Sequence, residues 1–225
     1  MLVLRDWKTP ASFYPEASLG NARIKTLRYR GIYAAYGLRG HHYYRAINLP
    51  VRTLAIDGKT WMVDDPPHWW AMQNHATFYH GHVLVAGLGL GLIVHTLHAN
   101  PEVEKITVIE REKDVIGLIS PLLPRGKVKI EHGDFWDWSG RVDGVFFDLF
   151  VGGGHALFLE ALRTYVQLLE QFPRPIRIHG FNNDNFDKLG EEISAGRPRV
   201  DGRRLLRDNS HGGLSASGKR LRGDS

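Results

Sequence analysis

Residues 82–94 constrain the fold more than any other stretch, because an apolar run leads there into a glycine-rich turn and then into a helical pattern. The run from 83 to 86 has the near-continuous apolar character of a buried parallel strand. Glycines in the turn allow positive φ and let backbone N–H groups approach a ligand at a helix N-terminus. The three glycines are Gly87, Gly89 and Gly91.

The glycine spacing narrows the ligand class. A dinucleotide fingerprint needs its third glycine three positions after the second, and Leu92 occupies that position. The sequence has G-x-G-x-G instead. Taken alone, this pattern also fits a tight strand-to-helix turn that binds nothing, so the rest of the chain has to decide.

Length and composition allow one α/β domain with an appendage. The chain has 225 residues, of which 43% are hydrophobic, enough for a sizeable core. It has no cysteine, which excludes disulfides and thiolate metal sites. The longest apolar run is too short and glycine-rich to span a bilayer, and charged residues stand where a signal peptide needs an apolar core. We therefore expect a soluble, cytoplasmic protein without a membrane partner.

The net charge of +5 belongs to the last part of the chain. Residues 194–225 hold eight basic and three acidic residues, and the remaining 21 basic and 21 acidic residues cancel. Glycine, serine and arginine dominate this stretch, so we predict a basic, disordered tail. It could bind nucleic acid, but no aromatic residue is interleaved among its arginines, and a solvated tail is favoured.

The chain before the glycine turn is predicted to be a β-rich segment over residues 1–63. Alternating side chains at 23–29 indicate a half-buried strand, and Asp57-Gly58 between two short strand patterns indicates a hairpin with a type I′ turn. An aspartate of the pair Asp64-Asp65, followed by a proline, suits the start of a helix that should end near Tyr79. Residues 64–193 then form the predicted ligand-binding domain.

Polar and aromatic residues follow the later strand patterns. Glu110 ends the second buried strand, at the distance where a carboxylate reaches the ribose of a nucleoside, although it also suits the first turn of the next helix. Asp134 and Phe135 follow the third strand and could hold an adenine ring, or form an Asx turn with a core aromatic. Asp148 ends the fourth strand. Carboxyl ends of parallel strands share one rim, so these groups should gather there.

The histidines before the glycine turn are interpreted as surface or packing residues. His75 and Tyr79 share a helix face, but no carboxylate completes a metal set. The sequence therefore predicts no metal site.

The chain resembles the class I S-adenosylmethionine (SAM)-dependent methyltransferases, especially the spermidine-synthase-like branch. The resemblance spans about residues 49–181 and is carried by the following segments: Val83–Gly91, Thr107–Arg111, Gly133-Asp134 and Asp143–Phe150. It implies a Rossmann-like, doubly wound, mostly parallel sheet preceded by a β-hairpin segment. It also implies SAM as cofactor, with the glycine turn at the methionine portion, Glu110 at the ribose, Asp134 and Phe135 at the adenine, and Asp148 orienting an amine or hydroxyl methyl acceptor.

Two departures from the resemblance leave alternatives open. Aminopropyltransferases have a second aspartate three residues after the first, where this chain has Val151. The last strands of the usual fold are not evident after Leu189, so the sheet is expected to be truncated. Methyl transfer is therefore favoured over aminopropyl transfer, and a degenerate SAM-fold binding module, with a sheet edge covered by a partner or a second copy, is the third hypothesis.

Overall fold

The computed structural model describes residues 1–34, 43–150, 155–172 and 177–180. The predicted tail at 194–225 and the region after Leu189, where the sheet was expected to be truncated, lie outside these residues. By its internal contacts, the chain from Met1 to Leu149 forms one unit together with Arg174–Gly180, and the helix at 155–171 belongs to a second unit.

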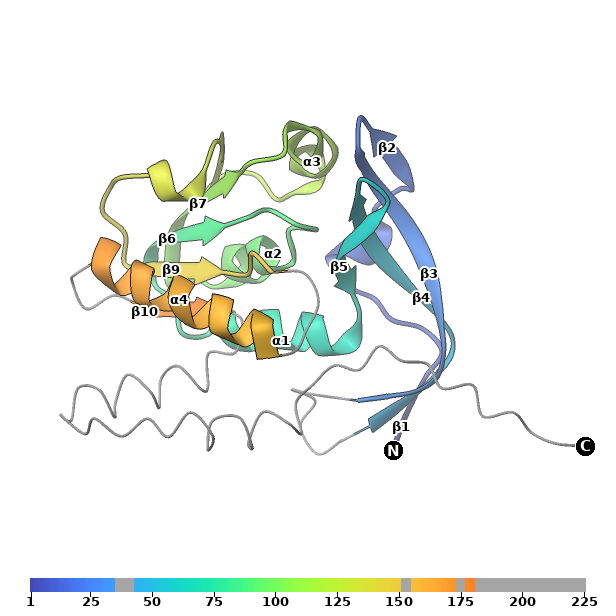
Figure 1. Ribbon diagram of the computed structural model, residues 1–225. Helices are drawn as coiled ribbons and strands as arrows, with labels where there is room; N and C mark the ends of the chain where they lie inside the picture. Colours follow the sequence, from blue (N-terminus) through green and yellow to red (C-terminus); the bar gives the residue numbers. More distant parts are fainter. Residues whose placement is uncertain (35–42, 151–154, 173–176, 181–225) are drawn as a thin grey trace, which may run out of the picture. The chain divides into compact units, whose positions relative to one another are not determined.

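The first sheet is built from the N-terminal part of the chain (Figure 1). Its order is β1-β4-β3-β2, and β5 also pairs with β4. All of its pairings are antiparallel except that of β1 with β4. The strands are β1 (Leu2–Leu4), β2 (Ala17–Leu19), β3 (Ala22–Ala34), β4 (Tyr43–Ile56) and β5 (Lys59–Asp64), with a 3₁₀ turn, η1 (Pro10–Phe13), between β1 and β2.

The predicted hairpin is confirmed as β4 and β5. Asp57 and Gly58 connect them, with φ of 50° and 77°. A type I′ turn needs positive φ at both central residues, and its twist matches that of the strands. The strand pattern noted at 23–29 lies within β3, which pairs with β4 along most of its length.

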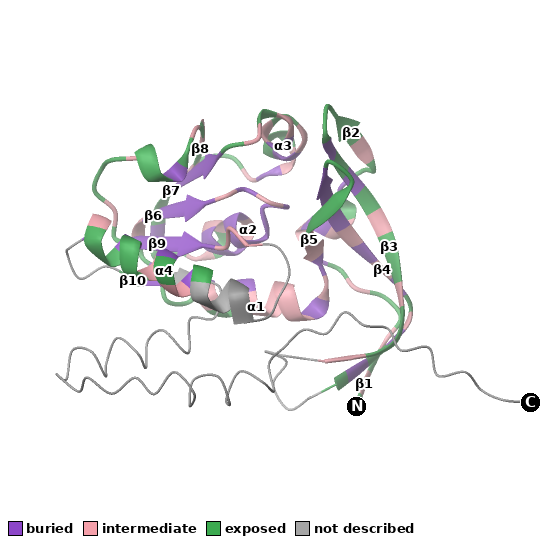
Figure 2. Ribbon diagram, in the orientation of Figure 1, coloured by how far each residue is buried: buried purple, intermediate pink, exposed green. Residues whose placement is uncertain are grey.

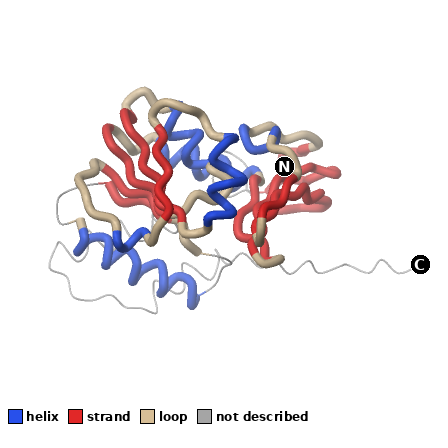
Figure 3. Tube along the Cα trace, turned by 90° about the horizontal axis from the view of Figure 1, so that it is seen from above, coloured by secondary structure: helices blue, strands red, loops and turns tan. Residues whose placement is uncertain are grey.

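The second sheet has the order β10-β9-β6-β7-β8, and all of its pairings are parallel. The chain moves outward from β6 to β7 and β8, and then returns to place β9 on the other side of β6. This is the doubly wound, Rossmann-like arrangement that the sequence predicted. The strands are β6 (Gly81–Ala86), β7 (Val103–Glu110), β8 (Val128–His132), β9 (Gly144–Phe147) and β10 (Arg177–Gly180). Figure 3 shows the strands of both sheets in red.

The central strands are buried on both faces (Figure 2). Val83 and Val85 of β6 point to the face that belongs to the main core, and Leu84, between them, is also fully buried. Full burial of one such side chain stabilises the fold by about 2 kcal/mol. Because neither face of these strands meets solvent, their sequences are continuously apolar, and this pattern allowed them to be predicted from the sequence.

Three of the described helices lie between successive parallel strands in the chain, and the first helix leads from the N-terminal sheet into β6. Their bounds are α1 (Pro66–Ala76), α2 (Leu92–Ala99), α3 (Lys113–Ile119) and α4 (His155–Gln171), with short 3₁₀ turns η2 (Ser120–Leu122) and η3 (Phe135–Asp137). Asp65 caps α1 by accepting a hydrogen bond from the His68 N–H at 3.2 Å. The helix ends at Ala76, one turn before the expected Tyr79. None of the described helices is long and apolar enough to cross a membrane.

Asp143 ties three strands together at their amino ends. Its carboxylate accepts from the His82 N–H at 2.8 Å, and its own N–H donates to the His82 carbonyl at 2.8 Å. The Arg177 N–H donates to its carbonyl at 3.2 Å. This end of the sheet is thereby fixed by backbone contacts, and the opposite, carboxyl end carries the candidate site.

Candidate functional site

The glycine loop lies where the strand order reverses, between β6 and α2. Ligands of open α/β sheets bind outside the carboxyl ends of strands at such a reversal. Gly87, Gly89 and Gly91 all have positive φ, between 52° and 83°. At Gly91 a Cβ would also lie 2.4 Å from Leu123 Cδ2, so glycine is needed there for space as well as for conformation.

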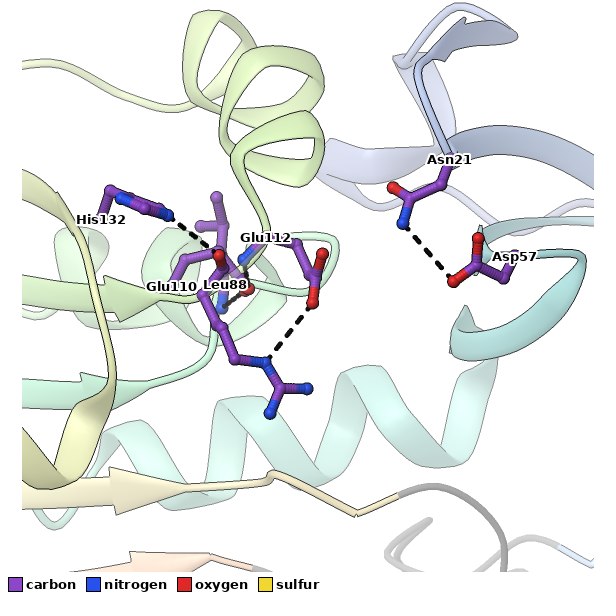
Figure 4. A network of polar contacts seen from close by, with 7 residues as sticks. Asn21, Asp57, Leu88, Glu110, Glu112 and His132 are labelled. Atoms are coloured by element: carbon purple, nitrogen blue, oxygen red, sulfur yellow. Dashed lines mark hydrogen bonds and ion pairs between the residues drawn. The ribbon is translucent and has the colours of Figure 1, made fainter.

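The Glu110 carboxylate is bound to the glycine loop (Figure 4). The Leu88 N–H donates to its Oε2 at 2.7 Å, and the Glu112 N–H donates to its Oε1 at 2.8 Å. The residue is only 9% exposed. Each carboxylate oxygen can accept a further hydrogen bond, so two acceptor positions remain beside the loop. The structure thus places Glu110, which was predicted to bind the ribose, in direct contact with the glycine turn that was predicted to bind the methionine portion.

Met62 of β5 covers the same loop, which the sequence analysis did not anticipate. Its sulfur accepts a hydrogen bond from the Leu90 N–H at 3.1 Å, and a Cβ on Gly89 would lie 2.5 Å from that sulfur. A ligand bound against Gly89 would therefore have to displace a flexible thioether. No sequence signal could have identified this contact, since it joins β5 of the first sheet to the glycine loop that follows β6 of the second.

Asp134 forms the Asx turn that was the alternative to adenine binding. Its Oδ1 accepts from the Trp136 N–H at 2.9 Å, and within the described part of the chain Oδ2 has no hydrogen bond that would compete with a ligand. Phe135 is 5% exposed and packs edge-on against Trp136, which is 39% exposed. The Gly133 N–H donates to the Glu110 carbonyl at 3.0 Å, so this turn lies beside the end of β7. The adenine role stays a prediction, and Trp136 has the more accessible ring.

Asp148 is half-buried directly after β9. Burial raises the pKa of its carboxyl to about 6, and the charge of His68 acts in the opposite direction. At neutral pH the group is mainly ionised and can still accept a proton. Asp148 thus has the properties required of a group that orients or deprotonates an acceptor.

His68, which we interpreted from the sequence as a surface or packing residue, is joined to this region. Its Nδ1 lies 2.6 Å from Asp65 Oδ1. Burial lowers the pKa of His68, but the hydrogen bond and charge of Asp65, with the charges of Asp148 and Asp64, outweigh it and leave the pKa raised. The spacing Asp65-x-x-His68, with the aspartate at a helix start, was a visible signal for this pair.

Asp64 is a fully buried carboxyl group at the end of β5. Thr9 Oγ1 donates to its Oδ2, and its Oδ1 has no hydrogen-bond partner in the described part of the chain. Burial raises its pKa to about 6, although the Thr9 hydrogen bond acts against the shift. The charges of Asp64, Asp65 and Asp148 therefore all favour the protonated form of His68.

His95 of α2 lies near the glycine loop but has a structural role. The Tyr14 hydroxyl and His95 Nε2 are 2.6 Å apart, and burial lowers the pKa of His95 to about 4. The ring stays neutral and links η1 to α2. Within the described residues no group of three or more histidines and carboxylates could hold a metal ion.

Comparisons with known proteins add little to this description. No protein-family model and no curated protein matches the chain. Parts of several solved structures are similar to it. A dimethyladenosine transferase from Plasmodium falciparum is 13% identical, with a TM-score of 0.39 over 55% of this chain and 44% of its own. Trm5b from Pyrococcus abyssi is 12% identical, with a TM-score of 0.38 over 65% of this chain and 46% of its own. The chain thus spans less than half the length of each structure, and the α/β class rests on its own strand order.

Proposed function

We propose that this protein is a SAM-dependent methyltransferase that transfers a methyl group to an amine or hydroxyl acceptor. The observation that carries the proposal is the pair of hydrogen bonds from Leu88 and Glu112 to Glu110. They fix a carboxylate beside a positive-φ glycine loop at the strand-order reversal. That combination suits a ligand with a ribose and a charged amino-acid portion.

Different residues of the chain would contact different parts of SAM and of the acceptor. The glycine loop would contact the methionine portion, Glu110 the ribose hydroxyls, and Asp134 with the neighbouring aromatics the adenine. Bound SAM supplies an electrophilic methyl group. Asp148 would orient the acceptor in line with that methyl group, and positioning of this kind supplies a large part of the rate enhancement.

Calorimetry with SAM and S-adenosylhomocysteine tests the proposal. We expect both to bind the full chain, and Glu110→Ala to lose binding of both. Glu112→Ala is the matched control, because it keeps the backbone N–H that binds Glu110 and removes a side chain whose ion pair is with Arg111, at 3.4 Å. Absence of heat with both ligands would contradict the proposal.

The acceptor can be sought with methyl-tritiated SAM. Separate extracts of small molecules, RNA and protein serve as acceptor pools, and labelled product is counted in each. Label in the small-molecule or protein pool would be consistent with an acceptor site to which the basic tail does not contribute. Binding of SAM without transfer to any pool would instead support the hypothesis of a degenerate binding module.

A further inference from the structure

The His68 ring is held in one orientation by a single carboxyl oxygen. Asp65 Oδ1 lies 2.6 Å from Nδ1 and also accepts the His68 backbone N–H at 3.2 Å. Asp65 is the N-cap of α1, so the start of the helix itself fixes the carboxylate. An ionised carboxylate only accepts, which means that Nδ1 carries the proton and donates it.

The other carboxyl oxygen of Asp65 is also engaged. The Tyr29 hydroxyl of β3 donates to Oδ2 through a long hydrogen bond of 3.5 Å. Burial, reinforced by the charge of Asp65, raises the pKa of Tyr29, so the phenol stays protonated and remains a donor. The Asp65 side chain is 13% exposed and the His68 side chain 41%. The carboxylate is therefore sheltered while the imidazole reaches solvent.

Among the described residues, His68 Nε2 has no hydrogen-bond partner, and the side chain is partly exposed. With the proton on Nδ1, this nitrogen has a free lone pair. The charged groups that act on the ring are Asp65 at its own helix start, Asp64 at the end of β5 and Asp148 after β9. All three favour the imidazolium over the neutral ring, so a proton that arrives at Nε2 is stabilised.

We propose that His68 is the catalytic base of the methyl transfer, taking the acceptor's proton at Nε2, and that Asp65 is the positioning residue that fixes its tautomer. This inference rests on the proposed function and deepens it by naming a second group beside Asp148. The arrangement is that of a base oriented by a carboxylate, in which the nucleophile is supplied by the substrate instead of by a serine or cysteine of the protein.

The proton transfer balances in simple terms. The N–H or O–H bond of the acceptor breaks, and its proton moves to Nε2 of His68. The electron pair left on nitrogen or oxygen forms the bond to the methyl carbon of SAM, and the pair of the broken C–S bond stays on sulfur, which gives S-adenosylhomocysteine. His68 then returns its proton to solvent through its exposed side.

Histidine NMR on the full chain measures the tautomer and the pKa of the His68 ring. With ¹⁵N-labelled histidine and His68→Gln for assignment, we expect the Nδ1–H tautomer and a pKa above the ordinary value of about 6.5. Asp65→Asn should lower this pKa while keeping the helix cap, because asparagine caps as well as aspartate. An Nε2–H tautomer, or a pKa at or below the ordinary value, would overturn the inference.

Methyl transfer to the acceptor pool labelled by tritium tests the catalytic role. His68→Gln should slow transfer by about 100-fold or more. The wild-type rate should rise with pH through the pKa measured by NMR, and Asp65→Asn should move that midpoint downward. His80→Gln is the matched control, since His80 is an exposed histidine after α1, and it should leave rate and midpoint unchanged. Equal rates in wild type and His68→Gln would overturn the inference.

SAM calorimetry separates this inference from the proposed function. His68→Gln should bind SAM as tightly as the wild type, because His68 is placed on the acceptor side. If no variant binds SAM, the proposed function fails whatever the ring shows. If SAM binds and no pool accepts label, the degenerate binding module is favoured and the catalytic role of His68 is overturned, whatever its tautomer.

Discussion

Asp64 and Asp65 show how two identical neighbouring side chains acquire different properties. Asp64 is buried, and one of its oxygens has no hydrogen-bond partner among the residues that the structure describes, whereas Asp65 caps a helix and holds a histidine. Asp64 is the last residue of β5, and Asp65 after it still has extended backbone, so their side chains point to opposite sides and the two carboxyl groups meet different surroundings. Sequence alone suggested either residue as a cap and could not separate these roles.

Asp64→Asn should change the pH dependence of stability. Because the folded-state pKa is raised from 3.8 to about 6, the folded protein binds a proton that the unfolded chain has lost, and the free energy of unfolding falls as pH rises from about 4 to 6. This shift of the Asp64 pKa corresponds to about 3 kcal/mol of unfolding free energy, which is lost as the pH rises over that range. Urea unfolding at several pH values should show a shallower fall in Asp64→Asn. Asp57 is an exposed aspartate in the hairpin turn, so Asp57→Asn should show the same pH dependence as the wild type. Parallel curves of unfolding free energy against pH for all three proteins would refute the raised pKa of Asp64.

Glu110→Ala should destabilise the fold even without ligand. It leaves the backbone N–H groups of Leu88 and Glu112 unpaired, at a cost of about 3 kcal/mol in total. Glu112→Ala removes only a surface ion pair and should cost less than about 1 kcal/mol. Thermal unfolding should also show that SAM stabilises Glu112→Ala but not Glu110→Ala. Equal stability of the two variants would mean that the loop contact does not hold the fold.

At the scale of elements, the parallel strands and the β4–β5 hairpin were predictable from local sequence. Buried strands are apolar throughout, and Asp57-Gly58 is a short-range turn signal. The predictions fell short where a contact joins distant elements. The contact of Met62 with the glycine loop and the effect of the Asp148 charge on His68 depend on how β5 and α1 pack, which periodicity does not reveal. Ala76 also ends α1 earlier than its apolar spacing suggested.

Gly91→Ala should be the most damaging glycine substitution at the start of α2. Its φ of 70° strains an L residue, and the new Cβ would meet Leu123 at 2.4 Å. Strain and overpacking together should cost about 3 kcal/mol. Gly126 also has positive φ, 99°, but nothing lies within 4 Å of its Cβ position, so Gly126→Ala should cost only about 1 kcal/mol. Urea unfolding gives both values, and equal losses would show that the Leu123 contact is relieved without cost.

At the scale of the whole molecule, the N-terminal sheet and the parallel sheet belong to one unit. Side-chain hydrogen bonds link them at separate places: Asp114 accepts from the Asn21 N–H at 3.0 Å, and Met62 from the Leu90 N–H. The boundary predicted at residue 63 stays a prediction, and β5 ends at Asp64, next to it. The hairpin segment ends at Asp64 and leads into Asp65, so the position of the proposed base His68 depends on this segment.

Deleting residues 194–225 tests the role of the basic tail. The rest of the sequence has no net charge, so we expect the truncated protein to bind SAM unchanged and to lose any low-salt affinity for DNA or RNA. Calorimetry and fluorescence anisotropy with a labelled oligonucleotide measure the two effects. Unchanged oligonucleotide binding at physiological salt would place the basic site in the folded domain and favour a nucleic-acid acceptor.

The strand order also sets the sequence of events by which the site is assembled. β6, β7 and β8 follow one another along the chain and pair in that order, whereas β9 pairs with β6 across about sixty residues. Loop closure over such a span costs more entropy than local pairing. The glycine loop and Glu110 therefore come together during early local folding, and Asp148 joins only when β9 docks. In pulse-labelling hydrogen exchange, amides of β7 should gain protection before those of β9, so that the cofactor side of the site is formed before the side that takes the acceptor.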